Sequence, residues 1–136
     1  MDGFRFSTDL KVRFAETDAQ GVVHHAAYLV WFENARIDYL ARFDGGYPAM
    51  RAAGVDATTV EANVRYLIPA RFPDQLDIGV RCVDVRGARF RFEYAIERDG
   101  TRLADGWTAH ACVDATTLRP TRVPAFLVAA IAAAEG

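Results

Sequence analysis

The chain has 136 residues, of which 51% are hydrophobic and 25% are charged. This length and composition are typical of one globular domain covering residues 1–136, and they exclude a disordered chain or two domains of ordinary size. The formal net charge of -2 argues against a general nucleic-acid-binding protein, because such proteins are usually basic. We therefore expect no nucleic-acid partner.

The sequence also favours the cytoplasm. Its start, from Met1 to Arg5, has no basic region followed by an apolar run, so we expect no signal peptide. No apolar stretch reaches the roughly 20 residues of a membrane span, so we expect no membrane partner. Cys82 and Cys112 are too few for a disulfide framework, which favours a reducing compartment.

The chain begins with a predicted strand and a loop. Residues 4–14 alternate between apolar and polar side chains, which predicts a half-buried strand with Leu10, Val12 and Phe14 on its apolar face. Residues 15–23 are mostly polar and include a glycine, which is typical of a loop.

A long helix is predicted next, from His25 to Arg42. Apolar side chains recur there at a spacing that places them on one helix face. We expect the helix to end near Gly45 and Gly46, because glycine readily takes the left-handed conformation of a helix end. The wide aromatic face suits a helix wrapped by a sheet, and it consists of Tyr28, Trp31, Phe32, Ala35, Tyr39 and Leu40.

Alternation returns after a short segment at residues 48–54 and predicts four more strands. The dipeptide Asp99-Gly100 between two alternating runs is a strong hairpin signal, and we expect all four strands to follow one another as hairpins. The strands cover residues 60–66, 76–82, 90–96 and 107–113, and a short helix at residues 124–134 follows.

This order of elements predicts an α+β fold, with an antiparallel β-sheet wrapped around one long central α-helix and a short C-terminal helix. Such a sheet has free edges, and pairing with a second copy of the chain is a usual way to cover them. We therefore expect a homo-oligomer, at least a dimer and further a dimer of dimers.

The residues that could carry chemistry lie where the first strand, the loop and the long helix meet. A helix N-terminus presents unpaired backbone N–H groups, which can stabilise the charge that a carbonyl oxygen gains when it is attacked. Asp18 lies just before this helix, so its carboxylate is a candidate nucleophile or general base. The same carboxylate could instead order the loop or cap the helix.

Two other groups of residues resemble known kinds of site, a nucleophilic set and a metal site, and neither is favoured. His110, Cys112 and Asp114 alternate along the last predicted strand, but residues two apart in a strand are separated by roughly 6.5 Å, beyond hydrogen-bond reach. Asp18 and the two histidines that follow it lack a second well-spaced pair of ligands, so we expect no metal. No nucleotide-binding or other cofactor motif is present, and we expect no cofactor.

The stretch from Thr17 to Arg36 resembles the signature of the hot-dog-fold acyl-CoA thioesterases of the 4-hydroxybenzoyl-CoA thioesterase and YbgC type. The similarity continues into residues 64–71 and 85–87, so it covers most of the chain. The resemblance implies a hot-dog fold and hydrolysis of an acyl-CoA to a free acid and CoA. The matching elements are Thr17-Asp18, Gly21-Val22-Val23, His25-Ala26, Tyr28 and Phe32-Glu33-Asn34-Ala35-Arg36.

The resemblance also implies roles for individual residues. The matching aspartate of the family is the nucleophile or the base that activates water, which assigns catalysis to Asp18. The backbone N–H near His25 would polarise the thioester carbonyl. The His25 side chain would orient the substrate or assist proton transfer, unless it only caps or packs at the helix end. Further substrate-binding positions are Gly21, Val23, His24, Tyr28 and Tyr66.

Arginines are the expected ligands of the CoA phosphates, because a guanidinium group matches phosphate geometry. In similar thioesterases basic residues in two regions bind the nucleotide, often across a subunit interface. Each of these arginines could equally be a solvated surface residue. In this chain they are Arg86, Arg89, Arg119 and Arg122.

Two positions depart from the family pattern. Ala27 stands where Asn or Ser is usual, which removes a polar group near the helix start, and His24 stands where an aromatic residue is common. From the resemblance we expect a thioesterase acting on an acyl-CoA. The acyl group is expected to be aromatic or of short to medium chain length, because Tyr28, Trp31, Phe32 and Tyr66 could form the walls of its pocket. The alternatives are a thioesterase acting on an acyl carrier protein and a catalytically idle acyl-binding module.

Overall fold

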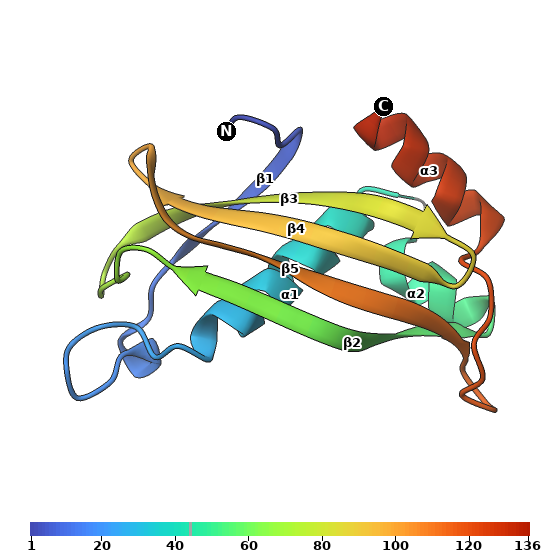
Figure 1. The fold of residues 1–136 in the computed structure, drawn as a ribbon, viewed down its shortest axis with the longest axis horizontal. Helices are drawn as coiled ribbons and strands as arrows, with labels where there is room; N and C mark the ends of the chain where they lie inside the picture. Colours follow the sequence, from blue (N-terminus) through green and yellow to red (C-terminus); the bar gives the residue numbers. More distant parts are fainter. Residues whose placement is uncertain (44) are drawn as a thin grey trace.

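The structure, a computed structural model, describes residues 1–43 and 45–136. None of the helices in this part of the chain has the length and apolar character that a membrane span requires. The elements in chain order are β1 (Phe6–Lys11), the 3₁₀ turn η1 (Phe14–Glu16), α1 (Ala27–Ala41), α2 (Gly46–Ala52), β2 (Val55–Tyr66), β3 (Gln75–Arg86), β4 (Arg89–Arg98), β5 (Thr101–Asp114) and α3 (Ala125–Glu135) (Figure 1).

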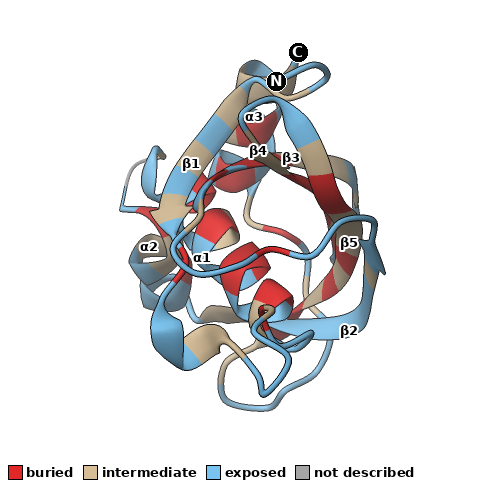
Figure 2. Ribbon diagram, turned by 90° about the vertical axis from the view of Figure 1, so that its left-hand side faces the viewer, coloured by how far each residue is buried: buried red, intermediate tan, exposed pale blue. Residues whose placement is uncertain are grey.

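The strands form one antiparallel sheet that curves around α1. The strand order is β1-β3-β4-β5-β2, and each neighbouring pair is antiparallel. Figure 2 looks along the molecule and shows α1 in the hollow of the sheet, with the buried residues gathered on the surfaces that face each other. The predicted α+β architecture, with a central helix and a short C-terminal helix, is confirmed.

The expectation of four strands in unbroken hairpin succession is wrong. The β4–β5 hairpin forms as expected, because Asp99 and Gly100 both adopt positive φ (50° and 81°), as a two-residue type I′ turn requires. However, β2 pairs with β5, and residues 67–74 carry the chain across the end of the sheet to β3. Alternation shows that a segment is a strand, whereas its partner is chosen by how the sheet closes around α1.

The first strand is shorter than the alternation predicts. Its ladder to β3 ends where Lys11 faces Gln75, and the Val12 N–H then donates to the Asp74 carbonyl oxygen (2.9 Å). Phe14, expected on the apolar face, instead begins η1 with 73% of its surface exposed. The turn at η1 therefore redirects the chain before the strand pattern ends.

The region around the predicted helix end also differs from expectation. Helix α1 ends at Ala41, and Gly46, expected as part of its stop signal, begins the unexpected helix α2. Glycine and proline in this segment lower its helix propensity, but Pro48 lies in the first turn, where proline is tolerated. Burial of Met50 in the core stabilises the helix in spite of its local sequence.

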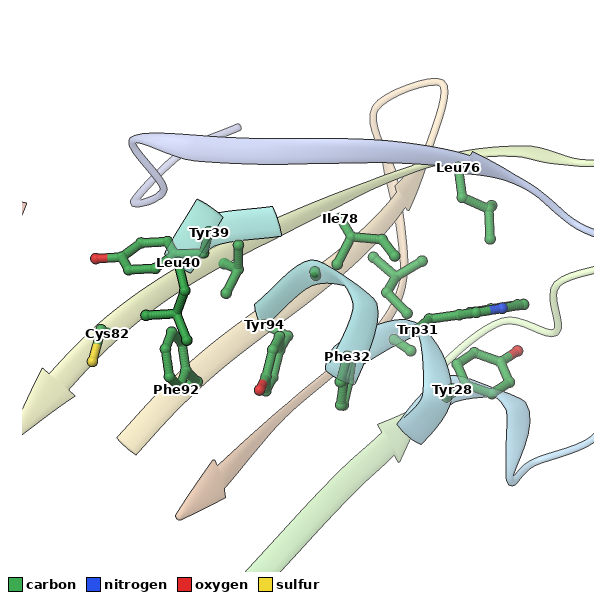
Figure 3. Close-up of a cluster of buried hydrophobic side chains, with 14 of the residues drawn as sticks. Tyr28, Trp31, Phe32, Tyr39, Leu40, Leu76, Ile78, Cys82, Phe92 and Tyr94 are labelled. Atoms are coloured by element: carbon green, nitrogen blue, oxygen red, sulfur yellow. The ribbon is translucent and has the colours of Figure 1, made fainter. Parts of the chain in front are cut away.

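The aromatic face of α1 forms the centre of the core, and all six residues predicted for it are buried. The Phe32 ring stacks on the Tyr94 ring of β4, with centroids 4.1 Å apart (Figure 3). On β5, a Cβ atom at Gly106 would lie 2.8 Å from the Phe32 ring, so the absence of a side chain there allows this close approach. Burial of each large apolar side chain contributes roughly 1.5–3 kcal/mol.

Helix α3 covers the part of β3 that β1 leaves unpaired. The β1 ladder extends only to Val80, and beyond it the Cys82 N–H donates to the side-chain carboxylate of Glu135 (2.9 Å). The same carboxylate oxygen accepts a hydrogen bond from the Tyr39 hydroxyl. Burial and the adjacent Glu135 raise the pKa of Tyr39, which keeps this hydroxyl a donor.

Replacement of Glu135 by alanine should destabilise the fold, because it leaves a strand N–H and the Tyr39 hydroxyl without an acceptor. We expect a loss of about 1–3 kcal/mol in the free energy of unfolding, measured by urea denaturation. Asp9→Ala, which removes an exposed carboxylate from β1, is the matched control and should change little. Equal losses in the two variants would show that Glu135 has no special role.

Candidate active site

A pocket of about 280 Å³ opens beside the start of α1. The predicted site residues Val23, His25, Tyr28 and Tyr66 line it together, although Tyr66 follows His25 by 41 positions in the sequence. The structure therefore brings these four residues into one site. The remaining wall residues are Val22, Leu67, Ile68 and Pro69, which the site prediction did not include.

Hydrogen bonds hold the far wall of this pocket against the first turn of α1. The Tyr66 hydroxyl donates to the His25 carbonyl oxygen (2.8 Å), and the Ala70 N–H donates to the Tyr28 hydroxyl (3.2 Å). The two tyrosine rings meet edge to face, with centroids 4.9 Å apart. Burial raises the pKa of Tyr28, so its hydroxyl stays protonated. Both tyrosines thus fix the wall and also line the pocket.

The N-terminus of α1 leaves backbone N–H groups without acceptors. The Ala27 N–H donates to the His24 carbonyl oxygen (2.9 Å), and the Ala26 N–H donates to His24 Nδ1 (3.2 Å). Within the described part of the chain, neither the His25 N–H nor the Tyr28 N–H has an acceptor. The His25 ring stacks on the ring of His24 and does not cap the helix. Two amide hydrogens are therefore available beside the pocket.

Asp18 lies in the loop that leads to this helix and is exposed. Its Oδ1 accepts hydrogen bonds from the N–H groups of Gln20 (2.8 Å) and Val22 (3.4 Å), so the carboxylate orders the loop. The Asp18 side chain does not line the pocket. The Asp18 N–H donates to the carbonyl oxygen of Val22, and Val22 lines the pocket. Gly21 forms the exposed tip of the loop at φ 79°.

Glu16 is a functional candidate that the sequence interpretation missed. Its carboxylate accepts hydrogen bonds from Trp31 Nε1 (2.7 Å) and from the Arg13 N–H (2.8 Å), and its carbonyl oxygen accepts one from the His24 N–H (2.8 Å). These bonds fix the loop of Asp18 to α1. Burial opposes ionisation of Glu16, but the hydrogen bonds from Arg13 and Trp31 and the charge of Arg13 outweigh it and lower the pKa of the carboxyl.

The four arginines predicted to bind CoA phosphates lie at the opposite end of the sheet from Asp18. The start of β3 contacts the chain before the Asp18 loop, and its end carries Arg86. The strand has 12 residues, which corresponds to about 40 Å at roughly 3.3 Å per residue. Asp18 and these arginines therefore do not form one site within a single chain.

The structure does bring the arginines close to one another. The segment after β5 returns to the β3–β4 turn, where the Val123 N–H donates to the Gly87 carbonyl oxygen (2.9 Å). Arg86 and Arg89 line an open depression of about 350 Å³ with Arg91, and Asp84 is the carboxylate among its lining residues. Within the described residues, no ion pair involves Arg86, Arg89, Arg119 or Arg122.

The His110, Cys112 and Asp114 side chains make no hydrogen bonds to one another. Asp114 accepts hydrogen bonds from the N–H groups of Thr116 and Thr117, and burial raises the pKa of the Cys112 thiol to about 11.

Across residues 1–43 and 45–136, no group of three or more His, Cys, Asp or Glu side chains is placed to hold a metal ion.

Glu16→Gln should weaken the anchor between the loop and α1. We expect the free energy of unfolding to fall by about 1–2 kcal/mol at neutral pH, because the carboxylate accepts charge-assisted hydrogen bonds. A lowered folded-state pKa stabilises the fold above the unfolded-state value, and this stabilisation is lost as the pH falls through the folded-state value. The deficit of the variant should therefore shrink in acid, as measured by urea denaturation across pH.

Trp31→Phe tests the same contact from the other side, because it removes the indole N–H and keeps an aromatic ring. The double variant should lose less free energy of unfolding than the sum of the two single variants, since both single changes remove the same hydrogen bond. Strictly additive losses would contradict a stabilising bond between Trp31 and Glu16.

Comparison with known proteins places the chain in a family. Residues 12–131 match the family model described as the thioesterase-like superfamily. The acyl-CoA thioesterase YbgC of Haemophilus influenzae is 32% identical over 126 residues, which is 92% of this chain and 93% of that protein. The acyl-CoA thioester hydrolase YbgC of Escherichia coli is 30% identical over 125 residues, which is 91% of this chain and 93% of that protein.

A solved structure agrees with these relatives. A thioesterase of Thermus thermophilus, crystallised with coenzyme A and Zn, superposes with a TM-score of 0.85 at 28% identity, over 100% of this chain and 98% of that one. The predicted hot-dog fold and enzyme class are confirmed at the level of the family. The chain belongs to the thioesterase-like superfamily.

Proposed function

We propose that the protein is an acyl-CoA thioesterase whose reaction takes place at the start of α1. The observation that carries the proposal is the pair of unpaired N–H groups, on His25 and Tyr28, beside the pocket and next to the loop of Asp18. Amide hydrogens in this position can bind the thioester carbonyl oxygen and stabilise the charge it gains. The acyl-CoA activity in the names of the relatives supports the same substrate class.

The chemistry requires few groups. Asp18 either attacks the carbonyl carbon, forming an anhydride that water then hydrolyses, or takes a proton from a water molecule that attacks the carbon. In both routes the C–S bond breaks, CoA leaves as a thiolate, and the acid is released. A thiolate is a good leaving group, so no strong acid is needed to protonate it. His25, exposed at the pocket, is positioned to orient the substrate or to assist proton transfer.

The pocket supports an aromatic or short- to medium-chain acyl group. Its apolar wall includes the rings of Tyr28 and Tyr66 and the side chains of Leu67 and Ile68. A cavity of about 150 Å³ accepts a benzene ring, so the 280 Å³ of this pocket accommodate a substituted ring or a chain of moderate length. A screen of aromatic, branched and straight-chain acyl-CoAs, followed with a thiol reagent, would identify the preferred acyl group.

Asp18→Asn should reduce the hydrolysis rate by about two to three orders of magnitude, because the amide is neither a nucleophile nor a base. CoA should still bind, measured by calorimetry. Asp9→Asn, an exposed change on β1, should retain full activity. A fully active Asp18→Asn enzyme would contradict the proposed role.

The intact protein distinguishes the remaining alternatives. Hydrolysis only of thioesters carried on an acyl carrier protein would indicate a carrier-protein thioesterase. Ligand binding with no hydrolysis of any thioester would indicate an acyl-binding module.

We also infer that the protein forms a homodimer through β2. This strand pairs with β5 on one side, and its other edge has no partner in the described part of the chain. Exposed apolar side chains follow the strand and its end, including Val60, Tyr66, Leu67 and Ile68. Antiparallel pairing of two β2 edges across a two-fold axis would continue the sheet and cover these residues. Two such dimers could pair further into the expected tetramer.

This dimer would resolve the separation between Asp18 and the arginines. Antiparallel pairing places the start of one β2 beside the end of the other. The start of β2 lies at the arginine end of the sheet and its end lies at the Asp18 end, so the arginine end of one chain would lie at the Asp18 end of its partner. The CoA phosphates of the substrate attacked in the partner chain would then be bound by Arg86, Arg89, Arg119 and Arg122.

The free, buried thiols of Cys82 and Cys112 fit the reducing cytoplasm expected for such an enzyme.

Hybrid dimers test this arrangement. An Arg86→Gln/Arg122→Gln variant should raise the KM for acyl-CoA with little change in kcat, because it removes phosphate contacts only. When differently tagged copies of this variant and of Asp18→Asn are co-expressed, the purified hybrid should regain about half of the wild-type activity at low substrate concentration, since one of its two composite sites is intact. A hybrid with no more than about half of the activity of the Arg86→Gln/Arg122→Gln homodimer would contradict sharing of the site.

A further inference from the structure

A second pocket lies at the opposite end of α1 from the candidate active site. It has about 210 Å³ of space and is enclosed by α1, α2, α3 and the ends of β2, β4 and β5. Its apolar walls include Leu40, Met50, Phe92, Leu127 and Ile131. A cavity of about 150 Å³ holds benzene, so this pocket has room for one substituted ring or a chain of about six to eight carbons.

A chain of hydrogen bonds ends at the wall of this pocket. Arg36 Nη1 donates to the Tyr94 hydroxyl (3.0 Å), which lies 2.6 Å from Thr108 Oγ1. Thr108 Oγ1 lies 2.7 Å from His110 Nε2, and His110 Nδ1 lies 3.3 Å from Thr59 Oγ1. Arg36, His110 and Thr59 line the pocket, whereas Tyr94 and Thr108 are buried behind it.

The direction of this chain follows from what each group can do. Arginine only donates hydrogen bonds, so the Tyr94 hydroxyl oxygen accepts one from Arg36. The hydroxyl hydrogen of Tyr94 then donates to Thr108 Oγ1. The Thr108 hydroxyl then donates to His110 Nε2, because no other acceptor for it is found among the described residues. The ring proton of His110 is therefore on Nδ1 and points to Thr59. The Thr59 hydroxyl oxygen accepts this hydrogen bond from His110, and its own hydrogen is free to donate into the pocket.

The lining of this pocket carries one guanidinium group, on Arg36, and one carboxylate, on Glu33. Burial, together with the charge of Arg36, lowers the pKa of His110 to about 3, so the imidazole is neutral at physiological pH. Arg36 is partly buried, and no carboxylate among the described residues forms an ion pair with it. Glu33 also lines the pocket but is exposed at the rim. The partly buried wall therefore presents the guanidinium group of Arg36, and the exposed Thr59 adds a hydroxyl donor at the edge of the pocket.

We propose that this pocket is a binding site for a small apolar carboxylic acid, aromatic or of medium chain length. The carboxylate accepts hydrogen bonds from Arg36 and Thr59, and the hydrocarbon part packs against Met50, Leu127 and Ile131. An anion is favoured over a neutral ligand of the same shape, because it supplies the counter-charge that the partly buried guanidinium lacks. All residues named here belong to one chain, and Asp18 is not among the lining residues of the pocket.

Binding of benzoate and of benzyl alcohol, which differ in charge but little in shape, tests the proposal by calorimetry. Benzoate should bind at least about tenfold more tightly than the alcohol, because a hydrogen bond to a charged group is stronger than one to a neutral group. Hexanoate and hexanol give the same comparison for a chain. Equal binding of acid and alcohol would overturn the proposal.

Variants locate the bound acid. Arg36→Gln and Thr59→Val should each weaken benzoate binding, whereas Arg5→Gln, at an exposed position outside the pocket, should not. Because Arg36 also supports Tyr94, Ile131→Phe provides a second test that fills the pocket and leaves the polar chain intact. Thermal unfolding checks that each variant is folded.

The outcome distinguishes this site from the candidate active site. Benzoate binding that is lost in Arg36→Gln and Ile131→Phe and retained in Asp18→Asn supports the proposal. Binding retained in both pocket variants, or lost in Asp18→Asn, places the acid elsewhere and overturns it.

Discussion

The packing of the aromatic face of α1 into the concave side of the sheet is the constraint on which the remaining structure depends. Phe32 lies between the Tyr94 ring and the bare backbone of Gly106, so the helix axis is held close to β4 and β5. Protein interiors are close-packed, and a helix held in this way has little freedom to slide or rotate. The position of each end of α1, and of the pocket beside it, follows from this contact.

The candidate active site depends on that fixed helix in a second way. The start of α1 has no side-chain cap on its N-cap residue, Ala26, and the usual capping residues would have occupied its free amide hydrogens. A helix without a cap at its N-terminus is less stable, and two contacts near the start of α1 offset this loss. The Glu16 carboxylate binds Trp31, and the Tyr66 hydroxyl binds the His25 carbonyl oxygen. The amide hydrogens thus stay available while the surrounding chain is held in place.

The antiparallel sheet separates two kinds of surface. One end carries the Asp18 loop and the apolar pocket, and the other carries the arginines and the second pocket. The proposed acyl-CoA substrate would need an acyl site and a phosphate site together, whereas a single copy of this sheet holds the apolar pocket and the arginines at opposite ends. The unpaired edge of β2 offers a way to join two copies with their ends reversed. In this view the same edge would stabilise the fold and complete the site.

Elements that depend on local periodicity could be predicted from the amino-acid sequence. The sequence predicted the buried face of α1, the segments that form β3 and β4, the Asp99-Gly100 turn, and a carboxylate in the loop before the helix. These features are readable because each side chain faces the core or the solvent according to its own element.

Contacts between residues that are far apart in the sequence became known from the packed structure. Four features have no periodic signal in the sequence. They are the pairing of β2 with β5, the helix at residues 46–52, the hydrogen bond from Trp31 to Glu16, and the chain of hydrogen bonds from Arg36 to Thr59. Each depends on how the sheet closes around α1, because that closure brings together groups that lie far apart along the chain. Local pattern sets which way a residue faces, whereas the contact it makes is a property of the whole packed chain.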